Sequence, residues 1–240
     1  MRTSLILRLA ALCCAALLLV SCGNETSSDE PAGAIPVEDV LANASTRLAD
    51  TESMHFDMRV DGNTYIDPEK SIQLVSAIGI MARPDKVEVE FQVRLFGTGT
   101  VTIKMITLGE HSWTTNLLTG KWETAPEEFG YNPAILYDNQ NGLGPVMGKI
   151  DDPQLAGTET ANGREAYHVT GSATSEVMDP LTAQTMSGDR IGIELWIDTK
   201  TWDLLRVVLK EPETPENSDP ATWTMNLTDH DKQVSIEPPR

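Results

Sequence analysis

The hydrophobic and polar positions of this chain follow a helical period near its start and a period of two through much of the rest. After Pro36, apolar residues return at spacings of three, four and seven. This spacing places them in one stripe and predicts an amphipathic helix that lies against a sheet. The stripe consists of Val37, Val40, Leu41, Ala44 and Leu48.

From Met54 onward, apolar and polar residues alternate, which predicts half-buried strands. The pattern is clearest in residues 87–95, and it is repeated in residues 54–60 and 191–197. Two further segments, residues 72–81 and 101–108, are apolar on both faces. Other strands are predicted at residues 155–161, 165–172, 204–209 and 223–227, the first two joined by a hairpin turn at Asn162-Gly163.

A helical insertion interrupts the strands. Residues 133–137 and 143–150 are predicted to form short helices, and residues 175–181 one helical turn. The order is a helix, about five strands, the insertion and about five more strands, without the spacing of βαβ units. The pattern therefore predicts an α+β fold in one domain, residues 36–240. Its architecture is a single, strongly curved antiparallel sheet, a half-barrel, whose concave face carries the helices and encloses an apolar cavity.

Residues 1–21 have the pattern of an export signal. A basic start precedes an apolar core of about 12 residues, which is short of the roughly 20 that a membrane-spanning helix needs. The segment ends in Leu19-Val20-Ser21-Cys22, which resembles the bacterial lipobox. The resemblance implies cleavage before Cys22, an S-diacylglycerol group on its sulfur and an acyl group on the new amino terminus. We therefore expect a lipoprotein anchored to the outer face of the cell membrane by Cys22.

The mature chain is predicted to begin with a flexible linker and to contain a single cysteine. Residues 22–35 are rich in Ser, Glu, Asp and Pro and predict a flexible linker. Cys13 and Cys14 lie inside the signal, so the mature chain keeps Cys22 alone, which excludes a disulfide and a cysteine metal site. Stability must then come from a packed core, and we expect a soluble, monomeric domain behind the anchor.

Net charge excludes one class of partner. The chain carries a formal charge of −18, and removal of Arg2 and Arg8 with the signal leaves −20. A surface this acidic repels nucleic acid, and no basic stripe interrupts it. Anionic lipid headgroups repel it as well, so that the acyl anchor must hold the protein at the membrane.

Three segments carry a family resemblance. Residues 131–180 hold the insertion and the Gly-containing hairpin, "IELWIDTKTWDLLRVVL" forms a strand-turn-strand, and a short last strand is expected to end in "QVSIEPP". With the lipobox and first helix, this order resembles the actinobacterial LppX/LprG/LprA/LprF lipoprotein family; the W-I-D turn also occurs in LolA-like carriers. The resemblance implies acyl chains of envelope glycolipids held between sheet and helices and carried from the membrane to the outer envelope. It implies no cofactor besides the bound lipid, and a membrane lipid exporter as a possible partner.

Strand parity and the apolar positions of the insertion identify candidate cavity residues. Alternating charges on residues 87–95 turn the opposite, apolar face inward, and the same reasoning applies to the neighbouring strands. The candidates are Val87, Val89, Phe91, Val93, Ile103, Met105, Leu136, Val146, Met147, Ile193 and Leu195.

Two other functional classes are an enzyme and a protein-binding or sensory module. The four histidines, His55, His111, His168 and His230, have no metal-binding spacing, and no G-x-S-x-G elbow occurs, so we expect no enzyme and no metal centre. Asp151-Asp152 and Glu127-Glu128 could hold calcium weakly, although solvated loop charge explains them better. An envelope-anchored protein-binding or sensory module stays open as the alternative to a lipid carrier, because the five tryptophans could form an interface, a core or a cavity mouth.

Overall fold

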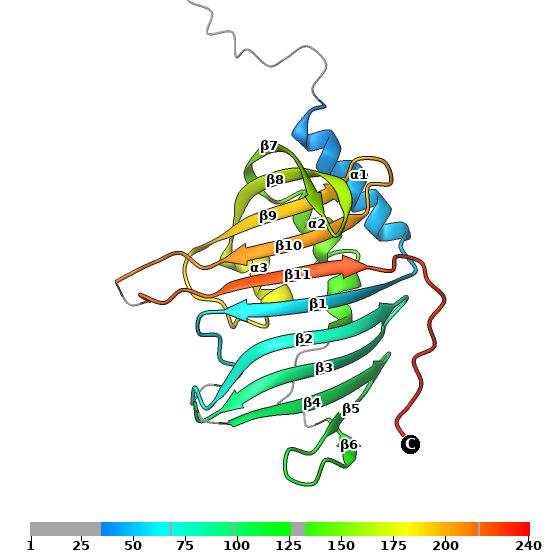
Figure 1. The fold of residues 1–240 in the computed structure, drawn as a ribbon, viewed down its shortest axis with the longest axis vertical. Helices are drawn as coiled ribbons and strands as arrows, with labels where there is room; N and C mark the ends of the chain where they lie inside the picture. Colours follow the sequence, from blue (N-terminus) through cyan, green and yellow to red (C-terminus); the bar gives the residue numbers. More distant parts are fainter. Residues whose placement is uncertain (1–34, 68, 98, 126–132, 216) are drawn as a thin grey trace, which may run out of the picture. The chain divides into compact units, whose positions relative to one another are not determined.

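Eleven antiparallel strands form one sheet in the computed structural model, which describes residues 35–67, 69–97, 99–125, 133–215 and 217–240. The strand order is β6-β5-β4-β3-β2-β1-β11-β10-β9-β8-β7, so two runs of hairpins are joined where β1 pairs with β11 (Figure 1). The edges β6 and β7 are far apart in this order, and the sheet is unclosed. The strands are β1 Ser53–Asp61, β2 Ile72–Ala82, β3 Lys86–Leu95, β4 Gly99–Leu108, β5 His111–Thr115, β6 Trp122–Thr124, β7 Asp151–Ala161, β8 Arg164–Thr174, β9 Arg190–Asp198, β10 Leu204–Lys210 and β11 Thr222–Thr228.

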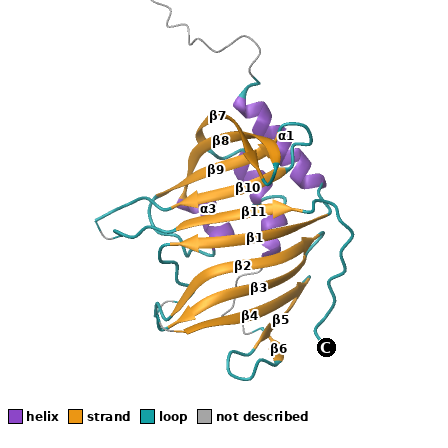
Figure 2. Ribbon diagram, viewed as in Figure 1, coloured by secondary structure: helices purple, strands orange, loops and turns teal. Residues whose placement is uncertain are grey.

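The helices lie on one face of the sheet, called the inner face below (Figure 2). They are α1 Val37–Asp50, the 3-10 helix η2 Pro133–Tyr137, α2 Leu143–Met147 and α3 Ser175–Thr182. The first helix begins directly after Pro36, and its buried residues are Val40, Leu41, Ala44 and Leu48, four of the five in the predicted stripe. The predicted fold class, one large antiparallel sheet with few helices, is confirmed.

Cross-strand register gathers one core on the inner face. Met58 pairs with Met225 on one side and with Ala77 on the other, and Leu195 pairs with Val207 in the second run of strands. These side chains belong to a single hydrophobic cluster that also contains the buried residues of α1, α2 and α3. Residues 35–240 form one compact unit, and this cluster lies within it.

The structure differs from the sequence-based prediction at four places. The helix predicted over residues 143–150 ends at Met147, directly before Gly148. The short strands β5 and β6 were not predicted, because five and three residues with mostly polar side chains give little alternation. Strand β7 begins at Asp151, four residues earlier than expected. The expected last strand ending in residues 233–239 is wrong: β11 ends at Thr228, and residues 233–239 have no regular structure. Ile236 is nevertheless buried, so this tail is held by packing and not by strand pairing.

The predicted signal peptide, residues 1–21, and residues 22–34 of the predicted linker lie outside the described residues, as does Cys22. Ile35, the last residue of the predicted linker, is described and packs against the core. Within the part of the chain that the structure describes, the helices are too short or too polar to cross a bilayer.

Candidate functional site

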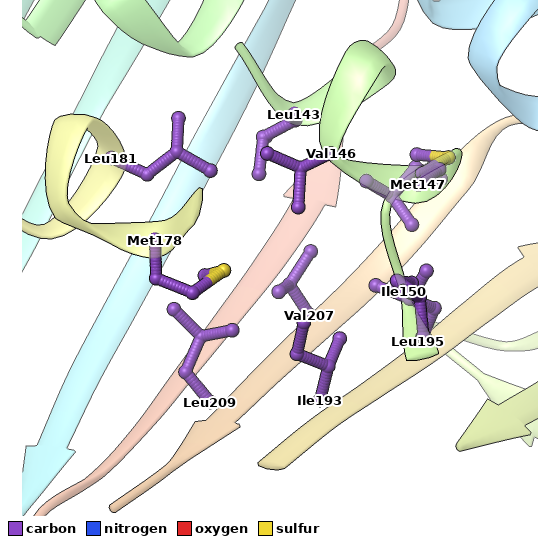
Figure 3. Close-up of a pocket in the computed structure, with 11 residues that line it drawn as sticks. Leu143, Val146, Met147, Ile150, Met178, Leu181, Ile193, Leu195, Val207 and Leu209 are labelled. Atoms are coloured by element: carbon purple, nitrogen blue, oxygen red, sulfur yellow. The ribbon is translucent and has the colours of Figure 1, made fainter. Parts of the chain in front are cut away.

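A small apolar cavity lies between the inner face and the helices α2 and α3. Figure 3 shows that side chains of α2 and α3 point toward side chains of β9 and β10 across it. Every lining residue is aliphatic or methionine. The lining consists of Leu143, Val146, Met147, Ile150, Met178, Leu181, Ile193, Leu195, Leu204, Val207 and Leu209.

Local structure explains how each element delivers its residues. Strand β9 alternates, so Ile193 and Leu195 both face inward. On β10, a bulge shifts the pairing between Leu204 and Arg206, and Leu204 and Val207 therefore share the inner face although they are three residues apart. In α3, Met178 and Leu181 are separated by about one helical turn and cover the cavity together.

The cavity has a volume of about 20 Å³, enough for about one water molecule. Pockets that hold small-molecule ligands enclose about 300–1,000 Å³. Its walls carry no charged side chain and contain carbon and sulfur only at their side-chain ends. The site can therefore attract an apolar group, but its lining offers no ionisable side chain for acid–base chemistry.

The predicted cavity residues divide into two groups. Val146, Met147, Ile193 and Leu195 line the cavity, as Figure 3 shows. The other seven lie in the same hydrophobic cluster, beyond the lining: six are buried, and Phe91 is partly buried. Their role in ligand binding stays a prediction. Those seven are Val87, Val89, Phe91, Val93, Ile103, Met105 and Leu136.

Seven lining residues were missed. Leu143 and Ile150 are apolar residues of the helical insertion, so the pattern that identified Val146 and Met147 could have identified them as well. Leu204, Val207 and Leu209 lie on a strand that is apolar on both faces, and the bulge breaks the simple alternation there. Met178 and Leu181 belong to a predicted helical turn whose position over the sheet no local pattern reveals.

Hydrogen bonds from the β2–β3 turn bind the C-terminal ends of α1 and η2 to the sheet. Arg83, in the β2–β3 turn, donates from Nη2 to the carbonyl of Leu48 and from Nε to that of Thr51, both at 2.9 Å. It also donates from Nη1 to the carbonyl of Tyr137, at 3.2 Å, and its guanidinium lies 4.6 Å from the centre of the Tyr137 ring. A cation at the last carbonyls of a helix is stabilising, so Arg83 holds the C-terminal end of α1 and the end of η2 together.

A second set of ion pairs ties α1 to the turn between β9 and β10. Arg47 Nε lies 2.8 Å from Asp203 Oδ1, and Arg47 Nη2 lies 2.5 Å from Asp231 Oδ2. Arg164 bridges Asp198 at 2.7 Å and Asp203 at 2.9 Å. The W-I-D motif thus has a structural role here, because its Asp198 also accepts backbone hydrogen bonds from Lys200 and Thr201.

Burial and hydrogen bonding shift the pKa values of this cluster. Burial alone would raise the pKa of Asp203, but hydrogen bonds from Thr201 and Arg164 outweigh it and hold that pKa below its usual range. The pKa of His230 is lowered, chiefly because burial disfavours the charged imidazole. The lowered pKa of Asp203 keeps this carboxylate charged for its ion pairs with Arg47 and Arg164.

The histidine and the acidic residues that were considered for catalysis or calcium binding take part in ion pairs or lie outside the described residues. His168 lies on the outer face, with Nδ1 3.0 Å from Glu159 and Nε2 3.1 Å from Glu194, and it stacks on Trp196 at 4.3 Å between ring centres. Asp151 pairs with Arg190 at 3.0 Å, whereas Glu127 and Glu128 lie outside the described residues. Within the described ranges, no three His, Cys, Asp or Glu side chains are grouped so that they could hold a metal ion.

The tryptophans do not form one surface. Trp223 is buried in the core and donates to Thr64 Oγ1 at 3.0 Å, whereas Trp196 is buried on the outer face. Trp113, Trp122 and Trp202 are half-buried, and no tryptophan is among the cavity-lining residues. An interface built from all five is therefore not supported by their positions.

The chain is similar in sequence to one family of lipoproteins. The model of the LppX_LprAFG lipoprotein family matches residues 37–236. A segment of 73 residues is 36% identical to LprF of Mycobacterium bovis, named as a candidate diacylated glycolipid transporter, and covers 30% of this chain and 28% of that protein. A segment of 109 residues is 29% identical to LprG of Mycolicibacterium smegmatis, named as a lipoarabinomannan carrier protein. It covers 45% of this chain and 44% of that protein. These matches span less than half the length of the curated relatives.

Comparison by structure covers more of the chain. The crystal structure of LprF from Mycobacterium bovis superposes with a TM-score of 0.67 at 20% identity, over 85% of this chain and 96% of that one. LppX of Mycobacterium tuberculosis gives a TM-score of 0.58 at 13% identity, over 83% and 99%. At these identities the likeness shows a shared fold, which here extends over most of both chains.

Proposed function

Because the chain belongs to the LppX_LprAFG lipoprotein family, we propose that it is an exported lipoprotein that carries envelope glycolipids. The acyl chains of the lipid enter between the inner face and the helices α2 and α3. The protein shields these chains from water while it carries the lipid between the cell membrane and the outer envelope. The process requires no catalytic residue, since the chemistry is transfer of apolar surface out of water.

The observation that carries this proposal is the wholly apolar cavity between sheet and helices. Each methylene group that leaves water for an apolar environment contributes about 0.8 kcal/mol. A chain of many methylenes therefore gains enough to compensate for leaving a bilayer. An unclosed sheet covered by short helices suits this task, because the helices can separate from the sheet without breaking a strand ladder.

Loading requires the cavity to grow. Its volume of about 20 Å³ is far below the space that an acyl chain fills, so α2 and α3 must move away from β9 and β10. The polar fastening by Arg83 and Arg47 lies at the end of α1, whereas the contacts across the cavity are apolar and non-directional. We expect α1 to stay in place and α2 and α3 to open, which breaks the hydrogen bond of 3.0 Å from Ser45 Oγ in α1 to the carbonyl of Gly144 in α2.

The anchor and the ligand class are further parts of the proposal. The lipobox and the family support a diacylglyceryl anchor on Cys22, with residues 22–35 as the tether to the outer face of the cell membrane. The names of LprF and LprG support a diacylated or otherwise acylated glycolipid as the cargo. A membrane exporter that delivers the lipid fits this role.

The experiment is extraction of the purified protein with organic solvent, followed by mass spectrometry of the extract. We expect an acylated glycolipid at a substantial molar fraction of the protein, enriched over the lipid of the membranes from which it came. A matched preparation of an unrelated lipoprotein with the same signal peptide controls for carried-over membrane lipid. Extracts without enriched lipid would favour the protein-binding or sensory alternative.

A further inference from the structure

Exposed apolar side chains gather at one end of the strands. Within the described ranges, five large hydrophobic side chains are exposed, and four of them lie on loops at this end. Phe96 is 79% exposed and Leu118 is 95% exposed, which is far from the usual environment of either residue. We call this group the apolar tip: Ile66, Phe96, Leu117 and Leu118.

Hydrogen bonds join two of these loops, and strand direction turns the third toward the same end of the strands. The backbone N–H of Ile66 donates to the carbonyl of Ile72 at 3.0 Å, and that of Phe96 donates to the carbonyl of Ser71 at 2.8 Å. The β5–β6 hairpin turns toward the same end, because β5 runs antiparallel to β4 and its last residue, Thr115, accepts a hydrogen bond from the Lys104 N–H. In Figure 1 the β1–β2 and β3–β4 connections lie at the left ends of their strands, and the β5–β6 hairpin lies below β4.

The hairpin that carries Leu117 and Leu118 has a defined backbone. The N–H groups of Leu118 and Thr119 both donate to Asn116 Oδ1 at 3.0 Å. This Asx turn fixes the loop so that the two leucines project from it, and neither folds back onto the core. Phe96 has φ of 47°, a conformation that is costly for an aromatic residue, at the tip of the β3–β4 hairpin.

Local charge distinguishes the apolar tip from the rest of the molecule. Loops 62–71, 96–98 and 116–121 contain two acidic and two basic residues, Asp67, Glu69, Lys70 and Lys121, so their net charge is zero. The whole chain carries −18. These three loops can therefore approach a bilayer without electrostatic repulsion of their own. The neighbouring loop 211–221, whose Asp219 accepts a hydrogen bond from Asn63, carries four acidic residues and must stay outside the bilayer.

The apolar tip also lies at the end of the sheet where α3 connects two strands. Asp61, which precedes loop 62–71, pairs with Thr222, which pairs in turn with Lys210. Lys210 pairs with Gly192, near the start of β9, and Thr174 and Arg190 on either side of α3 are partners. A bilayer at this end would face the connections that must move for loading.

We propose that the apolar tip inserts shallowly into a lipid bilayer and is the membrane-contacting surface of the protein. Leucine and phenylalanine on separate, projecting loops suit the headgroup–acyl boundary of a membrane. A protein partner would favour clustered Trp, Tyr or Arg, and leucine is under-represented among such hot spots. The role in loading rests on the proposed function, but the contact itself does not, and it can be measured on unloaded vesicles.

The test uses the mature chain from residue 22 with Cys22→Ser, which lacks the anchor and every other cysteine. Leu118→Cys then supplies a single thiol for an environment-sensitive fluorophore. With phosphatidylcholine vesicles we expect a blue-shifted emission that brominated acyl chains quench. The matched control is Ile78→Cys, also exposed at 46% but in the middle of β2, and it should show neither change.

Sedimentation with the same vesicles gives the second readout. We expect Phe96→Ser with Leu118→Ser to lower vesicle binding at least tenfold, Ile78→Ser to leave it unchanged, and thermal unfolding to be the same for all three. Vesicles containing phosphatidylglycerol should bind more weakly than phosphatidylcholine alone, because the chain is acidic. Absence of quenching at position 118, or equal loss with Ile78→Ser, overturns the proposal. Lipid extraction reports separately on the cavity, so failure of the apolar tip and failure of lipid carriage are distinguishable.

Discussion

Replacement of Val207 by tryptophan separates a lipid-binding cavity from an ordinary solid core. Val207 lies on β10, is 2% exposed and lines the cavity beneath α2 and α3. The substitution adds a volume on the order of 80 Å³, about four times the free space of the cavity. The indole must therefore either strain a fixed core or push α2 and α3 outward, as a lipid would.

The expected magnitudes follow from these volumes. If the helices yield, the free energy of unfolding changes by less than about 1 kcal/mol. The indole then occupies the space of about three methylene groups, which would have contributed about 2.4 kcal/mol to lipid binding, or roughly a fifty-fold loss of affinity. We expect near-normal thermal unfolding and a strongly reduced lipid yield on extraction.

The comparison variant is Val89→Trp on β3, a predicted cavity residue that lies beyond the lining of the observed cavity. Val89 is 1% exposed and pairs with Gly79, against which the ring of Phe56 lies so closely that even a Cβ there would clash. Overpacking at such a site costs about 1–3 kcal/mol, which corresponds to a fall in Tm of about 2–12 °C. The account is refuted if Val207→Trp lowers Tm as much as Val89→Trp does and leaves the lipid yield unchanged. Lipid loss at normal stability in Val89→Trp would extend the lipid site to β3.

Three further predictions concern the anchor and stability. Cys22→Ala should accumulate as uncleaved precursor without the acyl mass, as read by mass spectrometry of membrane fractions; an unlipidated mature amino terminus at another residue would contradict this. The free energy of unfolding should decline as pH falls below about 6.5. The cause is that His230 binds a proton in the unfolded chain, whereas its lowered pKa keeps it neutral in the folded state. The free energy of unfolding should decline further as pH falls from about 4 through the lowered folded pKa of Asp203. His230→Asn should remove only the decline that begins near pH 6.5, and a free energy of unfolding that stays constant between pH 7 and 5 would contradict this prediction. Thermal unfolding of the chain from residue 22 should be insensitive to reductant, and a reductant-dependent Tm would contradict the single-cysteine argument.

Sequence patterns were sufficient where a residue's environment is set by its near neighbours. The stripe of α1 and the alternation of β3 and β9 follow from one buried face per element, and all three elements were predicted. Strands β5 and β6 were missed because their residues are largely polar and their pairing depends on β4. The tail at residues 233–239 has strand-like residues, but Ile236 packs without any ladder.

The candidate site was predicted in part for the same reason. Ile193 and Leu195 follow from alternation, and Val146 and Met147 from the apolar insertion. Leu204 and Val207 share a face only because of the bulge, which no periodicity reveals. The position of α3 over β9 and β10, and the gathering of three distant loops at the apolar tip, depend on strand order, which the sequence leaves open.

The central claim is that acyl chains lie between the inner face and the helices α2 and α3. The most direct measurement uses a diacylated glycolipid with a photoreactive diazirine in one acyl chain, cross-linked to the purified protein and mapped by peptide mass spectrometry. The account predicts adducts on the cavity-lining segments of α2, α3, β9 and β10, with Met147 and Met178 among the labelled residues. Adducts confined to the outer face around Trp196 or to residues 229–240 would contradict it. Cavity adducts that persist at the same yield in Val207→Trp would contradict it as well.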